Sequence, residues 1–462
     1  LSTPRPLWSE QNPDEWWNAT RQAIRETLVG IPAQDVAAIG LSGQMMGLTA
    51  LDDAGKPLRP AILWNDQRSG DQCAQMTEQI GAERLHTIMG SIMLPGIVAP
   101  KLVWLREHEP ETYRQIEHVV LPKDYIRLKL SGAYVTDVSD GSGFGLIDMR
   151  TRAWSDELID AFDIPRAWLP DLCESPEICA YVTEEAAAET GLRQGTPIVG
   201  GAGDQPAQAI GSGIVQPGQT SITVGTSGVV FTAADQYNAD AQGRMHIWCH
   251  AIPETWCYIG VMLSAAGSLR WLHDELSKAM SYEELSALAA SLPIGAEGLL
   301  FAPYLSGERH PYADPLARGA FVGLTLRHGL AHMVRSTMEG VAFGLRDLLE
   351  IARSKGIHPQ SAAVSGGAAN SPVWREILTN VMGIPLYTVN TVQGAAFGAA
   401  ILAGVGAGAW QDVPTACQTL IKPDAVIPPT TPEVEQYENL YRLFRALYPT
   451  LHDMNTALAQ FG

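Results

Sequence analysis

The sequence has few cationic residues and few cysteines for its size. Its 462 residues include 31 lysines and arginines against 50 aspartates and glutamates, which gives a net charge of −19. This deficit of positive charge argues against a broad surface for nucleic acids or anionic membranes, although backbone N–H groups can still bind an anionic ligand locally. The six cysteines are scattered along the chain, which is typical of reduced thiols in a cytoplasmic protein.

Long apolar runs are also missing. The longest apolar run extends from Gly394 to Trp410; it is shorter than the roughly 20 residues of a membrane span and rich in Ala and Gly. Its Gly394 and Gly398 form a GxxxG pattern, which here predicts a buried helix whose backbone lies close to another element or to a ligand.

The opening LSTPRPLW has no secretory or transit pattern, so we expect a cytoplasmic protein without a membrane partner.

Two common nucleotide-binding motifs are absent. The sequence has no GxxxxGK[ST] motif, which excludes a P-loop kinase. The nearest match to a dinucleotide fingerprint, Gly404 to Ala409, follows a helical run rather than a strand, so we reject it. No short-period repeat of the solenoid kind is present.

What the sequence does contain is an alternation of strand-like and helix-like segments along both halves. A chain of this length is too long for one hydrophobic core, so two large domains are expected. With 46% hydrophobic and 18% charged residues, the composition is typical of a folded globular enzyme. Interleaved strands and helices predict an α/β fold with two lobes.

Local patterns predict individual elements. Asn12 and Pro13 open a helix over residues 12–29, as an N-cap and a first helical residue. Residues 36–42 and 60–64 are predicted to be strands, and SITV and VVF form a hairpin around Gly225 to Gly228. Residues 432–462 are predicted to form one or two amphipathic helices.

Asp204 is the first candidate for catalysis. It follows the apolar PIVGG and begins QPAQAIG, a segment with helical spacing. Asp is a common helix N-cap, which is the structural alternative. The two preceding glycines leave the carboxylate uncrowded at a strand end, which favours a functional role. A carboxylate without a neighbouring base suits proton acceptance from an alcohol during phosphoryl transfer better than it suits hydrolysis.

Two glycine-rich turns are candidates for binding a nucleotide. The turn from Gly225 to Gly228 carries two hydroxyl groups and could hold phosphate oxygens through its N–H groups, or could simply be a tight turn. Residues 365–370 lie between a strand and a helix. Their paired glycines would let a planar ring lie against the backbone, and the helix N-terminus favours phosphate; an ordinary turn is the alternative.

Polar residues at the ends of predicted strands mark a second group of candidates. The segment from Gln44 to Met46 lies between two glycines, and Trp64 to Asp66 end an apolar strand, where ligands bind in α/β proteins. Trp16, Trp17, Trp64 and Trp104 could line a sugar pocket, but helix-spaced aromatic residues are more often part of the core. His246, Cys249, His250 and Cys257 do not have a common zinc spacing, so we expect core packing, with a metal site as the alternative.

Taken together, these motifs resemble the FGGY family of carbohydrate kinases, within the actin-like ATPase superfamily, over essentially the whole chain. The most specific match is GAFVGL at Gly319, followed by HM at His332 and STME at Ser336. An upstream signature around KLVWL at Lys101 is also present, although Val98 stands where the family usually has Ser, Thr or Pro.

The resemblance implies a fold, an activity and site residues. The fold is two actin-like (ribonuclease H-like) ATPase lobes with a central cleft, residues 1–211 binding the sugar and residues 212–462 the nucleotide. The activity is an ATP-dependent phosphotransfer that uses Mg²⁺, with a homodimer compatible with the family and no nucleic-acid partner. Asp204 is the implied base and metal-binding residue. The implied sugar-binding residues are Gln44, Met45, Met46, Trp64, Asp66, Asp204 and Gln205. The implied nucleotide-binding residues are Gly225, Thr226, Ser227, Gly228, Gly366, Gly367, Ala368 and Asn370.

Within the family, the segments PLWSEQNPDEWW, PAILWNDQR, LPKDYIRLKLSG and PYLSGER are most similar to members that convert D-xylulose to D-xylulose 5-phosphate. Those members commonly have Gly-Gln-Met-His-Gly, whereas this chain has Met46 in the fourth position. A thioether is at best a weak acceptor, and a site that bonds a sugar hydroxyl discriminates strongly. Another ketose, a polyol or a sugar acid therefore stays open as the substrate.

The family's first hairpin, which carries an Asp-Leu-Gly-Thr phosphate motif and a metal-positioning Asp, has no counterpart in this sequence. The first residue is Leu1 rather than Met. Two expectations follow from this departure. Either the sequence is a truncated or partly ordered version of a longer protein, or the protein is a non-catalytic relative that binds a sugar or a nucleotide.

Overall fold

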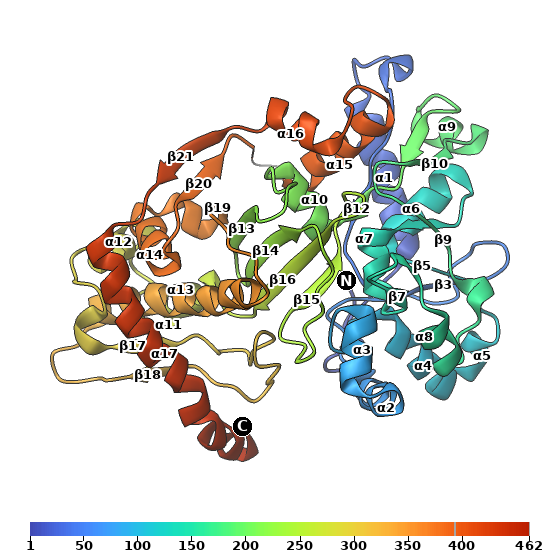
Figure 1. The fold of residues 1–462 in the computed structure, drawn as a ribbon. Coiled ribbons are helices and arrows are strands. Elements are labelled where there is room, and N and C mark those ends of the chain that lie inside the picture. The colour runs from blue at the N-terminus through green and yellow to red at the C-terminus, as the bar shows by residue number, and fades with distance from the viewer. Residues whose placement is uncertain (392–393, 462) are drawn as a thin grey trace.

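The C-terminal half of the chain is built on a seven-stranded sheet (Figure 1), in a computed structural model that describes residues 1–391 and 394–461. The strand order is β15-β16-β14-β13-β19-β20-β21. Strands β13, β19 and β20 are parallel, and the remaining neighbours are antiparallel. The strands are β13 (Thr220–Val224), β14 (Gly228–Ala234), β15 (His246–Cys249), β16 (Trp256–Met262), β19 (Ala362–Gly366), β20 (Leu386–Val389) and β21 (Pro423–Ile427).

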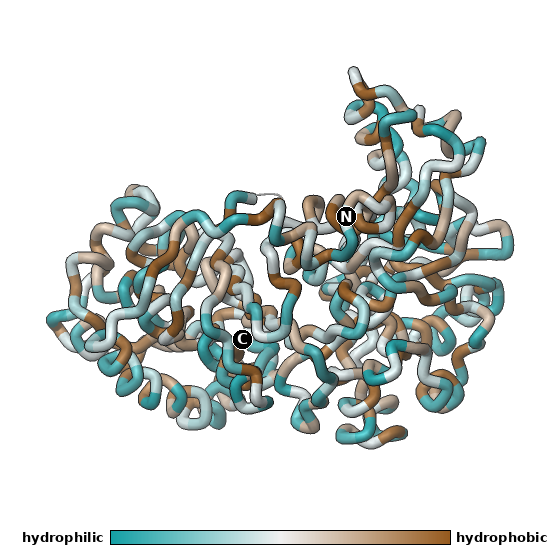
Figure 2. The backbone as a smooth tube through the Cα atoms, turned by 45° about the horizontal axis from the view of Figure 1, so that its top comes forward, coloured by the Kyte–Doolittle hydropathy of each residue, from teal (hydrophilic) through white to brown (hydrophobic). Residues whose placement is uncertain are grey.

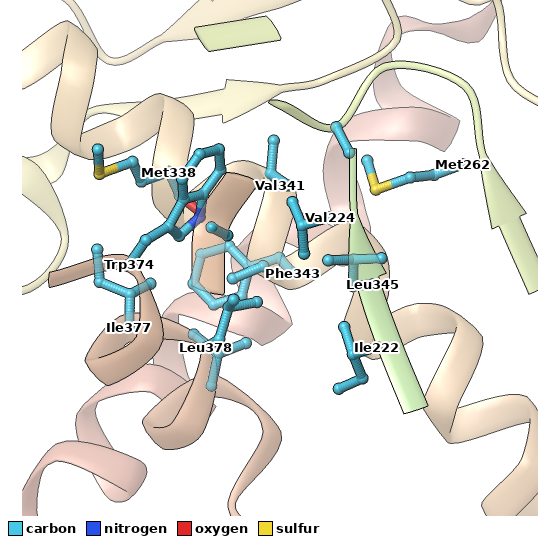
Figure 3. Packing of buried hydrophobic residues seen from close by; sticks show 14 of the residues in the cluster. Ile222, Val224, Met262, Met338, Val341, Phe343, Leu345, Trp374, Ile377 and Leu378 are labelled. Atoms are coloured by element: carbon cyan, nitrogen blue, oxygen red, sulfur yellow. The ribbon is translucent and has the colours of Figure 1, made fainter. Parts of the chain in front are cut away.

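A long helix, α13 (Leu330–Ser354), packs against this sheet and forms the centre of the largest core. Figure 3 shows Phe343 and Leu345 of α13 among residues of β13 and of α14 (Pro372–Met382). Trp374 of α14 is buried in this cluster, and its indole N–H donates to the Met338 carbonyl at 3.2 Å. Each large apolar side chain buried here stabilises the fold by about 1.5–3 kcal/mol. The helices α11 (Ala266–Leu276), α12 (Tyr282–Ala290) and α17 (Thr431–Leu458) and the pair β17 (Leu300–Ala302) and β18 (Ala320–Val322) complete this body.

The N-terminal half is helical, with short strands. Among the residues described, its strands pair only two at a time. The helices are α1 (Pro13–Thr27), α2 (Gly70–Ile80), α3 (Ala82–Met89), α4 (Val98–His108), α5 (Pro110–Tyr113), α6 (Pro122–Ser131), α7 (Val138–Gly141), α8 (Asp156–Ala161) and α9 (Glu184–Thr190). The strand pairs are β1 (Glu10–Gln11) with β4 (Ala61–Ile62), β2 (Ser42–Gly43) with β12 (Ala202–Gly203), β3 (Thr49–Leu51) with β5 (His118–Val120), β6 (Val135–Asp137) with β9 (Asp171–Cys173), β7 (Ile147–Asp148) with β8 (Ala153–Trp154), and β10 (Ile178–Tyr181) with β11 (Pro197–Val199).

Two helices between the bodies touch backbone to backbone (Figure 1). They are α10 (Asp204–Gly211) and α15 (Gly394–Gly406). A Cβ atom at Gly211 would lie 1.9 Å from the Gly394 carbonyl oxygen, and one at Gly398 would lie 1.9 Å from the Ala207 carbonyl oxygen. Glycine is therefore required at both positions, and the GxxxG prediction of a buried helix with a close backbone neighbour is confirmed.

Most of the local predictions are confirmed. The Asn12 side chain caps α1 by accepting from the Asp14 N–H at 3.0 Å, and the C-terminal segment forms one helix, α17. The predicted strands 36–42 and 60–64 shorten to two residues each; between 36 and 41 there is only an isolated bridge from Ile39 to Ile198. Figure 2 shows hydrophobic and hydrophilic segments alternating along the chain in both bodies. No helix in the described part of the chain is long and apolar enough to cross a membrane.

Candidate active site

A cavity of about 250 Å³ is lined by residues from both halves of the chain. From the N-terminal half come Gln44, Met45, Met46, Trp64, Asp204 and Gln205, and from the C-terminal half come Ser227, Val229, His246, Trp248, Ile259, Val261 and Arg309. Its size is below the usual range of about 300–1,000 Å³ for ligand pockets, which suits one small molecule. The cavity thus brings together six of the seven residues predicted to bind the sugar.

Asp204 is the first residue of α10 and, among the residues that the structure describes, the only carboxylate that lines this cavity. The N-cap of α10 is Gly203, so the alternative in which Asp204 caps the helix is not the arrangement observed. Its Oδ1 accepts from the Gln205 N–H at 2.9 Å, and within the described chain it has no ion pair. Burial raises the pKa of this carboxyl, partly offset by the hydrogen bonds from Gln205. A raised pKa improves Asp204 as a proton acceptor.

The turn from Gln44 to Met46 lies beside Asp204, because β2, which precedes the turn, pairs with β12, which precedes Asp204. Met46 has a left-handed backbone with φ of 69°, which is uncommon for a residue other than glycine. Met45 is buried and fills the space above Gly203, where a Cβ atom would lie 2.7 Å from the Met45 Cγ. Trp64 is 44% exposed, so a large apolar surface faces solvent and the cavity rather than the core. By contrast, Trp17 and Trp104 are core residues, as predicted.

Asp66 is the predicted sugar-binding residue that does not reach the cavity. It is fully buried, and its Oδ2 accepts from the Ser9 N–H at 2.6 Å. Arg68 binds both carboxylate oxygens, with Nε at 2.9 Å from Oδ1 and a terminal nitrogen at 2.8 Å from Oδ2. This bidentate pair turns Asp66 inward, so its role in the structure is to hold the loop after β4.

The turn between β13 and β14, which contains the predicted phosphate-binding residues, is held by the Gly225 N–H, which donates to the Ser227 carbonyl at 3.0 Å. The Gly225 carbonyl accepts from the Ala266 N–H at 2.8 Å, and the Thr226 carbonyl accepts from the Ala265 N–H at 2.9 Å. These bonds to the start of α11 hold both carbonyl groups in place. The N–H groups of Thr226 and Ser227 have no partner in residues 1–391 or 394–461. The arrangement leaves two free donors suited to phosphate oxygens.

A cation accompanies this turn. A terminal nitrogen of Arg270, in α11, donates to the Thr226 Oγ1 at 3.1 Å, and the Arg270 side chain is exposed. Gly228, the fourth predicted residue of the turn, is buried at the start of β14, where a Cβ atom would lie 2.8 Å from the side chains of Leu345 and Met262. Arg270 is not among the residues predicted from sequence. The pattern that could have indicated it is a cation in the first turns of the helix that follows β16.

The second glycine-rich turn lies beside the first. Because β13 and β19 are parallel neighbours with Val224 opposite Gly366, their carboxyl ends meet at one edge of the sheet. Gly366 has φ of 83°, and a Cβ atom there would lie 2.4 Å from the Val224 carbonyl oxygen, so only glycine fits. Gly367 and Asn370 are exposed, whereas Ala368 is fully buried in the core below them. The Ala368 side chain therefore packs rather than facing a ligand.

The wall from the C-terminal half contains polar groups that the sequence analysis missed. His246 was expected in the core; it is buried, but it also lines the cavity, as does Trp248 two residues later on β15. The Nε2 atom of His246 and the indole N–H of Trp248 have no hydrogen-bond partner in the described chain. Burial lowers the pKa of His246 well below its usual value, and the neighbouring positive charge of Arg309 adds to this effect, so its ring is neutral at pH 7.

Arg309 has no partner for its charge. Its guanidinium forms no hydrogen bond or ion pair with the described residues, although it lines the cavity. Burial lowers its pKa, and the neighbouring Glu308 partly offsets this. Burial also raises the pKa of Glu308 to about 8, and the Glu308 Oε1 accepts from the backbone N–H groups of Leu263 and Arg309. The free guanidinium is therefore available to a ligand in the cavity.

No cluster of three or more His, Cys, Asp or Glu side chains that could hold a metal ion occurs in the described ranges. Cys249, His250 and Cys257 are fully buried, and His250 Nε2 lies 2.9 Å from the Ile214 carbonyl oxygen, so the expected core packing holds for these three. The free carboxylate at the cavity is that of Asp204, whose Oδ2 has only a long contact of 3.4 Å with the Gln205 amide.

Comparison with known proteins identifies relatives of this chain. Two family models match it: the N-terminal domain of the FGGY family of carbohydrate kinases over residues 1–211, and the C-terminal domain of the same family over residues 220–407. The chain is 41% identical over 408 residues to the xylulose kinase of Escherichia coli (strain K12), which covers 88% of this chain and 84% of that protein.

Two solved structures have closely similar folds. A "xyloylose kinase" from Brucella ovis matches with a TM-score of 0.92 and 38% identity, covering 98% of this chain and 93% of that one. The gluconate kinase of Lactobacillus acidophilus matches with a TM-score of 0.93 and 26% identity, covering 100% of this chain and 93% of that one. The predicted fold class, two α/β lobes of the actin-like type with a central cleft, is confirmed by these matches.

Proposed function

This chain belongs to the FGGY family of carbohydrate kinases, and we propose that it transfers the terminal phosphoryl group of ATP to D-xylulose, giving ADP and D-xylulose 5-phosphate. The protein is thus a phosphotransferase whose acceptor is a sugar hydroxyl. Residues 1–211 supply the sugar-binding lobe in this proposal, and residues 212–462 supply most of the nucleotide site.

One observation carries the proposal: Asp204 and Ser227 line the same cavity. Among the described residues Asp204 has no ion pair, and Ser227 belongs to the turn in which the Thr226 and Ser227 N–H groups have no partner. A sugar hydroxyl bound beside Asp204 is therefore placed next to the position of a terminal phosphate. Phosphoryl transfer depends mainly on this kind of positioning and on neutralisation of charge.

In the proposed reaction, a terminal hydroxyl of the sugar donates a hydrogen bond to the Asp204 carboxylate. Its oxygen forms a bond to the γ-phosphorus while the bond from that phosphorus to the bridging oxygen of ADP breaks, and the proton passes to Asp204. The N–H groups of Thr226 and Ser227 hold the phosphate oxygens, with Arg270 adding positive charge. Met46, Trp64 and the other walls of the cavity position the sugar and exclude water.

Magnesium fits this arrangement as an ion held mainly by phosphate. Mg²⁺ usually binds one or two carboxylates together with substrate phosphates rather than a complete protein cage. The free Oδ2 of Asp204 meets that requirement, and the described residues include no group of three or more His, Cys, Asp or Glu side chains placed to hold a metal ion. When bound, the ion would neutralise charge on the phosphates.

A second candidate substrate is a sugar acid such as gluconate. The observation that favours it is the unpaired Arg309 guanidinium at the cavity, which matches a carboxylate better than it matches a neutral ketose. Met46 supports the same alternative, because it cannot donate to a sugar hydroxyl.

The test is ADP release by the purified protein with D-xylulose, D-ribulose, L-ketoses, polyols and D-gluconate as acceptors. We expect the highest kcat/KM with D-xylulose. Turnover with gluconate and none with D-xylulose would replace the first substrate by the second. Turnover with none of these acceptors would contradict both.

A further inference from the structure

Lys101, in α4, is fully buried and does not line the cavity. It lies behind the sugar wall, which we define as the turn from Gln44 to Met46 together with Trp64. Its ammonium group donates to three backbone carbonyls: Met46 O at 2.8 Å, Ile62 O at 3.3 Å and Gly96 O at 2.5 Å. These three bonds use all the donors of a lysine. The three acceptors lie in separate segments of the chain, so one side chain connects them.

Each acceptor leads to a residue of the cavity wall. Met46 lines the cavity itself, in the left-handed conformation that costs about 1–2 kcal/mol for a residue with a side chain. Ile62 ends β4, two residues before Trp64. Gly96 touches the same segment, because a Cβ atom there would lie 2.2 Å from the Trp64 carbonyl oxygen. Lys101 therefore holds both sides of the sugar wall from behind.

The fold alone does not require a lysine here. The rest of α4 from Val98 to Leu105 is buried and apolar apart from Lys101, and burying an ammonium group is costly unless it is well paired. The charges that act on it are those of Asp66 and Arg68, which form an ion pair with each other. Burial lowers the pKa of Lys101 to about 7, because the stabilising effect of Asp66 is smaller. Replacing buried charges by apolar residues is often neutral or stabilising in such sites.

We propose that Lys101 is a positioning residue of the sugar site, which fixes the Met46 backbone and the segment before Trp64 in the arrangement that binds the substrate. This inference rests on the proposed kinase function. Lys101 does not contact the substrate; it acts through the two wall residues that do.

The main test is Lys101→Met in the full chain, since Met has a similar length and no donors. Misplacement of a binding wall by about 1 Å can cost roughly 10²-fold in rate. We expect kcat/KM for D-xylulose to fall by about that factor while KM for ATP stays within about twofold. The matched control is Lys355→Met. Lys355 also donates to a backbone carbonyl, that of Ala239 at 2.7 Å, but it lies outside the cavity, so both KM values should be unchanged.

A double-mutant cycle distinguishes positioning from general loosening of the fold. Glycine adopts positive φ without strain, so Met46→Gly removes the need to hold that backbone. If Lys101 acts by holding that backbone, Lys101→Met should raise the sugar KM by a smaller factor in Met46→Gly protein than in the wild type. If Lys101→Met raises the sugar KM by the same factor in both backgrounds, Lys101 and Met46 are not coupled and the proposal is wrong.

Two further results would overturn it: unchanged kcat/KM for the sugar in folded Lys101→Met protein, or equal losses for sugar and ATP. If Lys101→Met does not fold, Lys101→Gln, which keeps two donors, should give an intermediate rise in sugar KM; an unchanged sugar KM in that variant would contradict the proposal. Calorimetric binding of D-xylulose without ATP separates the two hypotheses. If wild-type protein binds D-xylulose but transfers no phosphate, the kinase function is contradicted. The effect of Lys101→Met on the affinity for D-xylulose can still be measured in that case.

Discussion

Replacing Asp204 by asparagine separates proton transfer from the fold. Asn has the same shape and keeps an oxygen for the Gln205 N–H, but it cannot take a proton from the sugar hydroxyl. A general base contributes about 10²–10⁴-fold to a rate, so we expect kcat to fall by that factor. The free N–H groups of Thr226 and Ser227 are untouched, so KM for ATP should change by less than about threefold.

The same substitution should not weaken the fold. Burial raises the pKa of Asp204 above its unfolded value of about 3.9, so between these two pKa values the folded state binds more protons than the unfolded state. The free energy of unfolding therefore falls as the pH rises through that window, and at pH 7 the wild type carries a charge that destabilises it. Asp204→Asn removes this charge. Its melting temperature at pH 7 should equal or exceed that of the wild type, and the difference should shrink below pH 4.

Steady-state ADP release, measured across pH with thermal melts in the same buffers, tests both expectations. The rising limb of kcat/KM against pH should be present in the wild type and absent in Asp204→Asn. A matched control is Asp347→Asn. Asp347 is also a buried carboxylate, and burial raises its pKa to about 6, but it binds Tyr441 and lies outside the cavity, so kcat should be unchanged. Near-wild-type turnover in Asp204→Asn would refute the assignment of the base.

Three other substitutions test the neighbouring groups. Arg309→Gln should lower kcat/KM for the sugar by roughly 10- to 100-fold, because a hydrogen bond to a charged group contributes about 1.5–3 kcal/mol, while the melting temperature should not fall since no protein partner is lost. Arg270→Ala should raise KM for ATP a few-fold and leave KM for the sugar unchanged, with an effect that shrinks as salt is added because the side chain is exposed. Asp66→Asn should lower the free energy of unfolding by about 3–5 kcal/mol in denaturant titrations, because it breaks a buried pair with Arg68, while the folded fraction keeps its kinetics; a catalytic loss without a loss of stability would return Asp66 to the sugar site.

The parts of the site that could be predicted from sequence are those set by local chemistry. The hairpin around Gly225 follows from two apolar runs joined by a glycine turn, and the antiparallel pairing of β13 with β14 confirms it. The glycines before Asp204 indicated an uncrowded carboxylate, and the structure places it at the cavity. The roles of these residues in binding and catalysis stay predictions until they are tested by substitution.

The parts that could not be predicted depend on tertiary contacts. Asp66 follows a strand as Trp64 does, but Arg68 binds it and turns it inward, which the order of residues does not reveal. His246 and Trp248 are spaced to share one face of β15, yet the pattern does not indicate whether that face meets the core or a cavity. Lys101 had a signal, as a lone charge in an apolar helix, but its three carbonyl partners come from distant segments.

The glycine contacts between α10 and α15 also constrain how the two bodies can move. Where two helices meet backbone to backbone, as at Gly211 and Gly398, neither helix can slide along the other without a clash. Asp204 is the first residue of α10, so that contact holds it close to α15. We therefore expect α10 and α15 to move as one unit in any closing motion, so that the proposed base keeps its position relative to α15.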